Sequence, residues 1–240
     1  MPGKAIIIGA TSGIGRSLAV ELHNRGYIVG ATGRRNQRLK ELQDELGDRL
    51  YIQTMDVSHT ENAIKQLKRI TDQMNGLDII VLNAGISRSG EGTTRKTDLK
   101  VVDINIRGFA NLTSFCFEQF EKQGHGHLVG ISSIASLFGW GRTPVYNASK
   151  SFVNTYLQGY RQKANHSDAN ITITNILPGF VRSEMTENKK NMFWVSSAKK
   201  AATQIADAIE AKKDKAYVTK RWRLIAWLIK LIPEKIWNRM

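Results

Sequence analysis

The sequence has few of the residues and segments that mark several classes of protein. Its 240 residues include one cysteine, Cys116, which excludes an internal disulfide and argues against a zinc cluster, so we predict no metal site. No apolar run approaches the roughly 20 residues needed to cross a bilayer. The apolar run near the N-terminus, at residues 5–8, is too short for a signal peptide. We therefore expect a cytoplasmic protein.

Acidic residues are also scarce relative to basic ones. The chain has 35 Lys and Arg against 21 Asp and Glu, a net charge of +14. Such an excess favours an anionic partner: nucleic acid, anionic lipid or a phosphorylated cofactor. Residues 211–240 carry nine basic side chains and only two acidic ones, Asp214 and Glu234. No nucleic-acid recognition motif is present, so we do not expect nucleic acid as the partner.

Prolines number only four, and no proline-rich or serine-rich linker divides the chain. Short Ile- and Val-rich segments alternate with longer segments of helical period. This alternation predicts a single α/β domain of the Rossmann type, a doubly wound parallel sheet with helices on both faces. We expect residues 1–210 to form the body of this domain, and residues 211–240 a basic amphipathic extension of it. The predicted strands are 4–9, 27–32, 50–55, 77–82, 127–132 and 171–177, and the predicted helices 13–25, 37–46, 60–74, 98–123 and 145–164.

A glycine-rich turn follows the first predicted strand. Gly9, Gly13 and Gly15 lie between a buried strand and a helix. Glycines at this spacing let the backbone turn tightly and approach a pyrophosphate, and the N-terminus of the helix supplies amide donors. Taken alone, the motif also fits a tight turn that binds no ligand.

The residues after the second predicted strand bear on the choice between NAD and NADP. An NAD site normally has a carboxylate there for the ribose 2′-hydroxyl, yet no acid lies between Leu22 and Lys40. Arg34 and Arg35 stand there instead. An arginine can form a bidentate charged pair with a 2′-phosphate. We therefore expect NADP(H) rather than NAD(H), with Arg34 as the main contact and Arg35 or Ser12 assisting, although two solvated arginines opening a helix remain an alternative.

A tyrosine and a lysine four residues apart lie near the start of the fifth predicted helix. Tyr146 and Lys150 would share one helical face. An ammonium close to a phenol favours the phenolate and lowers its pKa, which gives a proton donor and acceptor usable near neutral pH. The pair alone is a weak signal in a lysine-rich chain, so its weight depends on the residues around it.

Seven motifs occur in an order that resembles the short-chain dehydrogenase/reductase family, over about residues 3 to 210. Ser133 precedes Tyr146 by the family's customary thirteen residues, so we choose it over Ser132 and Ser136. Ile8 and Leu82 depart from the family pattern, which has threonine and asparagine there. The motifs are Gly9-x-x-x-Gly13-x-Gly15, Asp56-Val57, Asn83-Ala84-Gly85, Asn105, Ser133, Tyr146-x-x-x-Lys150 and Pro178-Gly179.

The resemblance implies a role for each of these residues. Tyr146 would exchange a proton with the substrate oxygen, and Ser133 would hydrogen-bond that oxygen. Lys150 would lower the tyrosine pKa and hold the nicotinamide ribose, and Asn105 would anchor a water that restores the proton. The expected cofactor-binding residues are Gly9, Thr11, Ser12, Gly13, Ile14, Gly15, Arg34, Arg35, Asp56, Val57, Asn83, Ala84, Gly85, Tyr146, Lys150, Pro178, Gly179, Val181 and Ser183.

The predicted function is NADP(H)-dependent hydride transfer to or from a carbonyl or secondary alcohol. The alternative is a nucleotide-sensing protein on the same fold whose catalysis is vestigial. Apolar residues near both ends of the expected substrate site favour a lipophilic substrate, although ordinary core packing also explains them. They are Ile134, Leu137, Phe138 and Trp140 after Ser133, and Met185, Met192, Phe193 and Trp194 after Gly179.

The tail contains a short amphipathic helix, at residues 222–232. At 1.5 Å per residue it would be roughly 16 Å long, too short to span a bilayer. Arg223 and Lys230 would share one narrow face, beside Lys220 and opposite a broad apolar half. Residues 220–237 could therefore lie on an anionic membrane surface. The alternatives are packing over the active-site mouth or against a second subunit, because the resemblance implies a homodimer or homotetramer.

Overall fold

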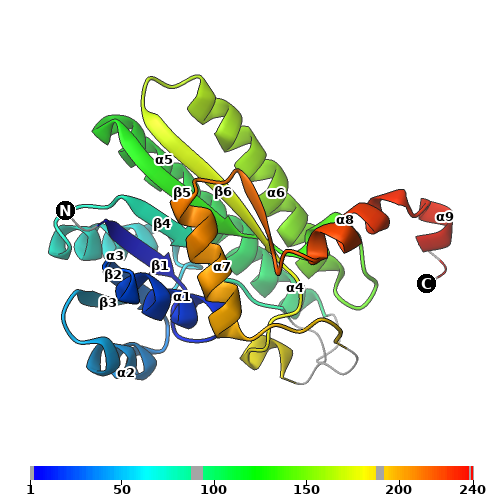
Figure 1. Ribbon diagram of the computed structural model, residues 1–240, viewed down its shortest axis with the longest axis horizontal. Coiled ribbons are helices and arrows are strands. Elements are labelled where there is room, and N and C mark those ends of the chain that lie inside the picture. The colour runs from blue at the N-terminus through cyan, green and yellow to red at the C-terminus, as the bar shows by residue number, and fades with distance from the viewer. Residues whose placement is uncertain (1–2, 88–93, 188–191, 238, 240) are drawn as a thin grey trace.

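The chain folds around a parallel β-sheet that is covered by helices on both sides. The computed structural model describes residues 3–87, 94–187, 192–237 and 239. These residues form seven strands in the order β3-β2-β1-β4-β5-β6-β7, with every neighbouring pair parallel (Figure 1). The strands are β1 (Lys4–Ile8), β2 (Ile28–Gly33), β3 (Leu50–Thr54), β4 (Ile79–Leu82), β5 (His125–Ile131), β6 (Asn170–Pro178) and β7 (Lys215–Val218).

Strand β1 shows why the middle of the sheet has continuous apolar sequences. Successive side chains of a strand point to opposite faces, and both faces here are covered. Ala5 and Ile7 pack into one core cluster, while Ile6 and Ile8 pack into the other. None of these four side chains is more than 2% exposed.

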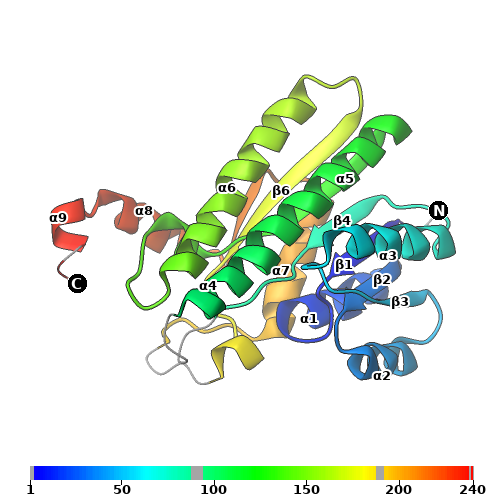
Figure 2. The ribbon, with the colours of Figure 1, turned by 180° about the vertical axis from the view of Figure 1, so that it is seen from behind.

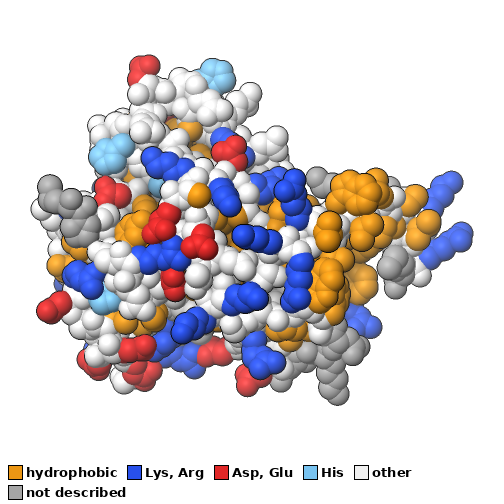
Figure 3. Space-filling model, in the orientation of Figure 1, with side chains coloured by type: hydrophobic (Ala, Val, Ile, Leu, Met, Phe, Trp, Pro, Cys, Tyr) orange, Lys and Arg blue, Asp and Glu red, His pale blue; other side chains and the backbone are white. Residues whose placement is uncertain are grey.

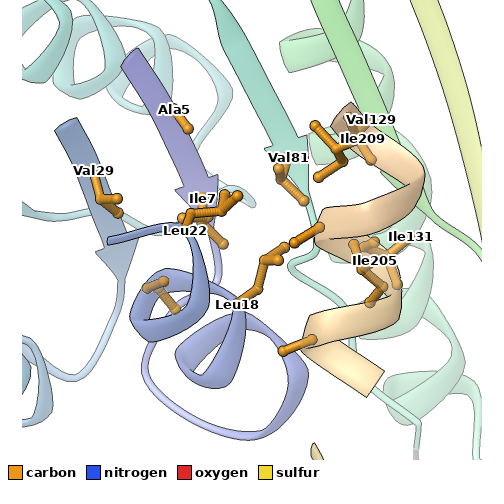
Figure 4. Close-up of a cluster of buried hydrophobic side chains, with 14 of the residues drawn as sticks. Ala5, Ile7, Leu18, Leu22, Val29, Val81, Val129, Ile131, Ile205 and Ile209 are labelled. Carbon is orange, nitrogen blue, oxygen red and sulfur yellow. The ribbon is translucent and has the colours of Figure 1, made fainter. Parts of the chain in front are cut away.

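Each face of the sheet has its own helical layer. Leu18, Leu22 and Ile205 pack with Ile7 in one layer (Figure 4). Phe117 and Phe120 are the largest fully buried side chains of the other. The first layer contains α1 (Gly13–Asn24), α2 (Asn36–Leu46) and α7 (Ala198–Glu210), and the second contains α3 (Thr60–Gln73), α5 (Phe109–Gln123) and α6 (Pro144–Asn165) (Figure 2).

The fold class predicted from the sequence is confirmed, and all six predicted strands occur. The structure adds β7, which pairs with β6 and so brings the start of the C-terminal extension into the sheet. It also adds α7. The single helix predicted at 98–123 consists of α4 (Arg95–Val102), a π-helical segment (Asp103–Gly108) and α5. Asn105 lies in the π-helical segment, which places it on the side of α6.

The C-terminal residues form an arm that projects from the body of the molecule (Figure 1). It consists of α8 (Trp222–Leu231), close to the predicted 222–232, and the short α9 (Glu234–Trp237) after Pro233. In the part of the chain that the structure describes, none of the helices combines the length and the apolar character needed to cross a membrane.

Candidate active site

The glycine turn lies between β1 and α1. The order of the strands changes direction at β1, because β2 lies on one side of it and β4 on the other. Gly9 and Gly13 have φ values of +93° and +56°, which favour glycine. A Cβ on Gly15 would lie 2.1 Å from the carbonyl oxygen of Gly9. Asn83 Nδ2 donates to that same oxygen at 2.7 Å and so holds the turn against β4. Ser12 makes no side-chain cap to α1, so its hydroxyl leaves the first amides of the helix to another acceptor.

A cavity of about 500 Å³ opens beside this turn. Its glycine cradle and uncapped helix N-terminus fit a dinucleotide, because backbone and phosphate can approach closely there. The predicted cofactor residues that line it are Gly9, Thr11, Ser12, Gly13, Ile14, Arg34, Arg35, Asp56, Val57, Asn83, Ala84, Gly85 and Ser183. The predicted residues that do not line it are Gly15, Tyr146, Lys150, Pro178, Gly179 and Val181. Lining residues that the sequence did not indicate include Thr32, Met55, Ser87 and Glu184, and Met185, expected near the substrate, also lines it.

Two arginines lie at the end of the cavity near β2. Arg34 is half exposed, and its Nη1 lies 3.9 Å from Asp56 Oδ2. The Arg35 guanidinium is fixed, because its Nη2 donates to Thr11 Oγ1 at 2.8 Å and to Ser12 Oγ at 2.7 Å. Its Nη1 donates to Glu184 Oε2 at 2.7 Å. The cavity thus presents an arginine pair where a 2′-phosphate would need cations.

Glu184 is a functional-site residue that the sequence reasoning missed. It binds both Arg35 and Arg38, and hydrogen bonds from these two arginines lower the pKa of its carboxyl. It begins a short 3₁₀-helix, Glu184–Thr186, on the far side of the cavity. Because 149 residues separate it from Arg35, no local spacing could have indicated the pair.

Asp56 and Val57 follow β3 at the wall of the cavity. Ser58 donates to Asp56 Oδ1 from its amide at 3.0 Å and from its hydroxyl at 2.7 Å. Burial raises the pKa of the Asp56 carboxyl, but these bonds and the charge of Arg34 together lower it. Asp56 is therefore held as a carboxylate acceptor, directed by Ser58.

Three of the four predicted catalytic side chains meet where β5 ends and α6 begins. Ser133 lies just after β5, and its hydroxyl accepts from the amide of Ala135 at 3.1 Å. Burial raises the pKa of the Tyr146 phenol, and a hydrogen bond with Ser133 acts in the opposite direction. Lys150 Nζ lies 5.9 Å from the centre of the Tyr146 ring. The structure therefore brings Ser133, Tyr146 and Lys150 together.

The environment of Lys150 differs from the sequence-based prediction. Its ammonium is buried, only 6% exposed, and donates to the carbonyl oxygen of Ile131 at 2.8 Å. Burial lowers the pKa of Lys150 to about 8. We expected the lysine to lower the pKa of Tyr146, but the net direction here is upward, because burial of the phenol dominates and the ammonium binds a backbone oxygen.

Asn105 connects the cavity to α6. Its Oδ1 accepts from the amide of Ile86 at 2.8 Å, and its Nδ2 donates to Ile86 O at 2.9 Å and to Ser149 Oγ at 3.0 Å. The Cβ position of Gly85 is 3.4 Å from both Asn105 Oδ1 and Lys150 Nζ. The amide side chain therefore fixes the loop after β4 close to the lysine.

Ser132 and Ser136 do not take the place of Ser133. The Ser132 hydroxyl is buried and donates to the carbonyl oxygen of Lys150 at 3.0 Å, which joins β5 to α6. Ser136 Oγ donates to Ser133 O at 2.5 Å. All three serine hydroxyls bond to the backbone, but of the three only Ser133 acts on the pKa of Tyr146.

The residues after β6 form the other wall and contact the C-terminal arm. Val181 is buried, and Ser183 lies against Gly13, whose Cβ position is 3.2 Å from Ser183 Cβ. Gly179 has no room for a side chain, since a Cβ would lie 2.0 Å from the Trp222 ring. Trp222 is 2% exposed, and the sequence reasoning assigned it no place in the site.

The arm also contacts the segment that follows Ser133. Trp237 Nε1 donates to the carbonyl oxygen of Gly139 at 2.7 Å, and the Trp237 ring centre lies 4.8 Å from that of Phe138. Trp140 lies 6.1 Å from the same ring. The inner side of the arm therefore packs beside the candidate active site, which is one of the alternatives expected for the tail.

Comparison with known proteins agrees with this geometry. The model of the short chain dehydrogenase family matches residues 3–194. An uncharacterized oxidoreductase of Myxococcus xanthus is 35% identical over 76% of this chain and 73% of its own length. The NADP-dependent 3-hydroxy acid dehydrogenase YdfG of Escherichia coli O6:H1 is 33% identical over 73% of this chain and 71% of its own. A short chain dehydrogenase/reductase of Burkholderia phymatum in complex with NAD superposes with a TM-score of 0.85 at 18% identity, covering 95% and 92% of the two chains.

Proposed function

The chain belongs to the short chain dehydrogenase family and is an NAD(P)-dependent oxidoreductase, and from this premise we propose that it reduces lipophilic carbonyl compounds with NADPH or oxidises the corresponding secondary alcohols. The observation that carries the proposal is the meeting of Ser133, Tyr146 and Lys150 beside a cavity with a glycine cradle.

A nicotinamide cofactor held along the cavity supplies or accepts the hydride. Tyr146 donates the proton to the carbonyl oxygen, and the raised pKa of its phenol keeps that proton in place at neutral pH. Ser133, whose hydroxyl acts on the pKa of the phenol, stabilises the negative charge that develops on the same oxygen. In the oxidative direction Tyr146 would first lose its own proton to water, and the phenolate would then take the proton from the alcohol.

Lys150 and Asn105 complete the proposed catalytic set. With a pKa of about 8, Lys150 is mostly protonated at neutral pH and close to losing its proton, which suits a group that resupplies Tyr146. Asn105 holds Ile86 in place and so keeps Gly85 close to Lys150 Nζ. Pro178, Gly179 and Val181 lie outside the lining of the cavity and would support the opposite wall from behind.

The preference for NADP(H) over NAD(H) is part of the proposal. Arg34 and Arg35 line the cavity, and no acid occupies the end of β2. One relative, the E. coli YdfG protein, is named as NADP-dependent. Arg34 would be the main contact, because its guanidinium is half exposed and, among the described residues, makes only a long ion pair with Asp56.

Apolar side chains support a lipophilic substrate. Met185 and Phe193 are 42% and 50% exposed after β6, and Phe138 and Trp140 follow Ser133. Met192 lies next to Phe193. Apolar side chains on both sides of a catalytic tyrosine, exposed at Met185 and Phe193, favour an apolar substrate body.

We further propose that the protein is cytoplasmic, forms a homodimer or homotetramer, and contacts an anionic membrane surface through residues 220–237. The net charge of +14 supports the last point, since half of it lies in residues 211–240.

The test is NADPH oxidation in the presence of a panel of ketones, followed by absorbance. We expect turnover, with faster rates for apolar ketones, and loss of roughly 99% of it or more in Tyr146→Phe, the 10²–10⁴-fold effect of a lost general acid. NADPH affinity should stay within about threefold, because the phenol does not line the cofactor cavity. Tight NADPH binding without turnover of any ketone would favour a nucleotide-sensing protein instead.

A further inference from the structure

Helix α8 has two apolar faces, and only one of them is covered. Trp222 and Ala226 face the body and are each 2% exposed. Four other residues, at the spacing i, i+3, i+4 and i+7, share the outward face. They are Leu224, Trp227, Leu228 and Leu231, at 65%, 63%, 49% and 59% exposed. A helix that is apolar on both sides usually has a partner on both, so the outward face indicates a second surface that covers it.

The charges around this face select the partner. Lys220, Arg221, Arg223, Lys235 and Arg239 are all exposed on the arm. From residue 215 to the end of the chain, the sequence has a single acid, Glu234. Two copies of the arm that met face to face would bring cations against cations. An anionic lipid surface is complementary to both the apolar face and its basic border.

A basic groove adjoins the arm. It has a volume of about 370 Å³ and lies between α7, β7 and the start of α8. Lys213, Lys220 and Arg223 line it, and within the described residues their side chains form no ion pair or hydrogen bond. The one carboxylate in its lining, Asp207, already binds Arg25 at 2.7 Å. Figure 3 shows Lys and Arg side chains beside the hydrophobic side chains of the arm on this side of the molecule.

We propose that the arm and this groove together form a docking surface for an anionic phospholipid bilayer. The outward face of α8 enters the boundary between headgroups and acyl chains, and Lys213, Lys220 and Arg223 bind lipid phosphates. Helix α8 lies along the surface, because its ten residues extend about 15 Å and the bilayer core is about 30 Å thick.

Docking in this way places the substrate entrance at the membrane. The inner side of the arm contacts Gly179 through Trp222 and Gly139 through Trp237, on the two segments that flank Ser133 and Tyr146. A lipophilic ketone dissolved in the bilayer would therefore reach the site without crossing bulk water. This last step rests on the proposed function, whereas docking itself does not.

Sedimentation with vesicles tests the docking surface. The full chain is mixed with vesicles of phosphatidylcholine alone, or of phosphatidylcholine with phosphatidylglycerol. We expect it to pellet with the second kind only and to be released by salt. The double variant Leu224→Ser, Leu228→Ser should bind at least tenfold more weakly, by the transfer energy of two exposed leucines. Leu99→Ser, which changes a 51% exposed leucine on α4, is the matched control and should bind as the wild type does.

The groove is tested by charge. Lys220→Gln with Arg223→Gln should weaken binding roughly thirtyfold, since each cation near an anionic surface contributes about one kcal/mol. Lys40→Gln with Lys65→Gln, on α2 and α3, is the control and should have little effect. Equal recovery of wild type and variants in the supernatant at low salt would overturn the docking surface. It would also be overturned by a wild type that self-associates but binds no vesicles, if the leucine variant loses that self-association.

Reduction of a water-soluble ketone without vesicles separates the two proposals. Turnover that is retained in the leucine variant, together with lost vesicle binding, supports docking. Turnover by a wild type that never pellets overturns docking and leaves the reductase intact. Pelleting without turnover overturns the reductase and leaves docking intact.

Discussion

Arg35 Nη1 donates to Glu184 Oε2 at 2.7 Å and so joins the two sides of the cofactor cavity. The Glu184 carboxylate thus accepts a hydrogen bond from the Arg35 guanidinium, to which a 2′-phosphate would also bind. Arg38 binds the same carboxylate, so three charged side chains share one corner of the cavity.

Glu184→Gln should strengthen NADPH binding. Removing the carboxylate frees Arg35 and Arg38 to bind the phosphate. It also removes a negative charge that would repel the phosphate. An exposed ion pair is worth up to about 1 kcal/mol, so we expect a two- to fivefold lower Kd for NADPH and little change for NADH. Titration calorimetry measures both constants, with Glu187→Gln as the control in the same segment. Weaker NADPH binding in Glu184→Gln would mean that the carboxylate serves to position the arginines.

Arg34→Ala should weaken NADPH binding and spare NADH. Loss of one charge-assisted contact to a phosphate costs about 1.5–3 kcal/mol, or ten- to hundredfold in Kd. Arg69→Ala, an exposed arginine of α3, is the control. A converse design that adds an acid at Gly33 is excluded by packing, because a Cβ there would lie 2.6 Å from Thr11 Cγ2. A wild type that prefers NADH would contradict the assignment of Arg34.

Local patterns predicted the sheet, the glycine turn and the meeting of Ser133, Tyr146 and Lys150. The apolar run of β1 and the glycines after it are read from neighbouring residues. Strand β7 was not predicted, because its sequence, Lys-Ala-Tyr-Val, is not a continuous apolar run and its pairing with β6 cannot be read from it. A spacing of four places Tyr146 and Lys150 on one face of α6, but it does not show that the ammonium turns to Ile131.

Contacts between segments far apart in the chain could not be predicted either, because local patterns do not show which segments meet. Glu184 and Trp222 matter through Arg35 and Gly179, and only the folded chain brings these pairs together. The apolar residues of the tail were predicted to face one way. The structure divides them, because Trp222 inserts beside Gly179 and thereby turns Leu224 and Leu228 outward.

Gly179→Ala should destabilise the protein and displace α8. The added Cβ would overlap the Trp222 ring, and overpacking of this kind costs about 1–3 kcal/mol in the free energy of unfolding. Gly159→Ala is the control: its Cβ would meet nothing within 4 Å, and alanine in a helix should add about 0.5–1 kcal/mol. Urea denaturation measures both. The double variant Gly179→Ala, Trp222→Leu should lose less free energy of unfolding than the sum of the two single variants. Strictly additive losses would contradict the contact between Gly179 and Trp222.

The last prediction concerns a buried histidine in β5. His127 is 6% exposed, and its Nε2 lies 2.7 Å from Thr174 Oγ1. Thr174 already donates to the carbonyl oxygen of Lys213 at 2.6 Å, so its oxygen must accept from His127, whose Nε2 therefore carries a proton. Burial, and then the charge of Lys212, lower the pKa of His127 to about 4.

This pKa makes the protein less stable in mild acid. The unfolded histidine takes a proton near pH 6.5, whereas the folded one does so only near pH 4, so the unfolded state gains protons first. The contribution of His127 to the free energy of unfolding is complete above pH 6.5. It declines by up to about 3 kcal/mol as the pH falls toward 4. Urea denaturation from pH 7 to pH 4 should show this decline in the wild type and in a His166→Gln control, whose histidine is exposed. His127→Gln should lower stability at pH 7 and flatten the slope, and a slope equal to that of the wild type would show that another group titrates.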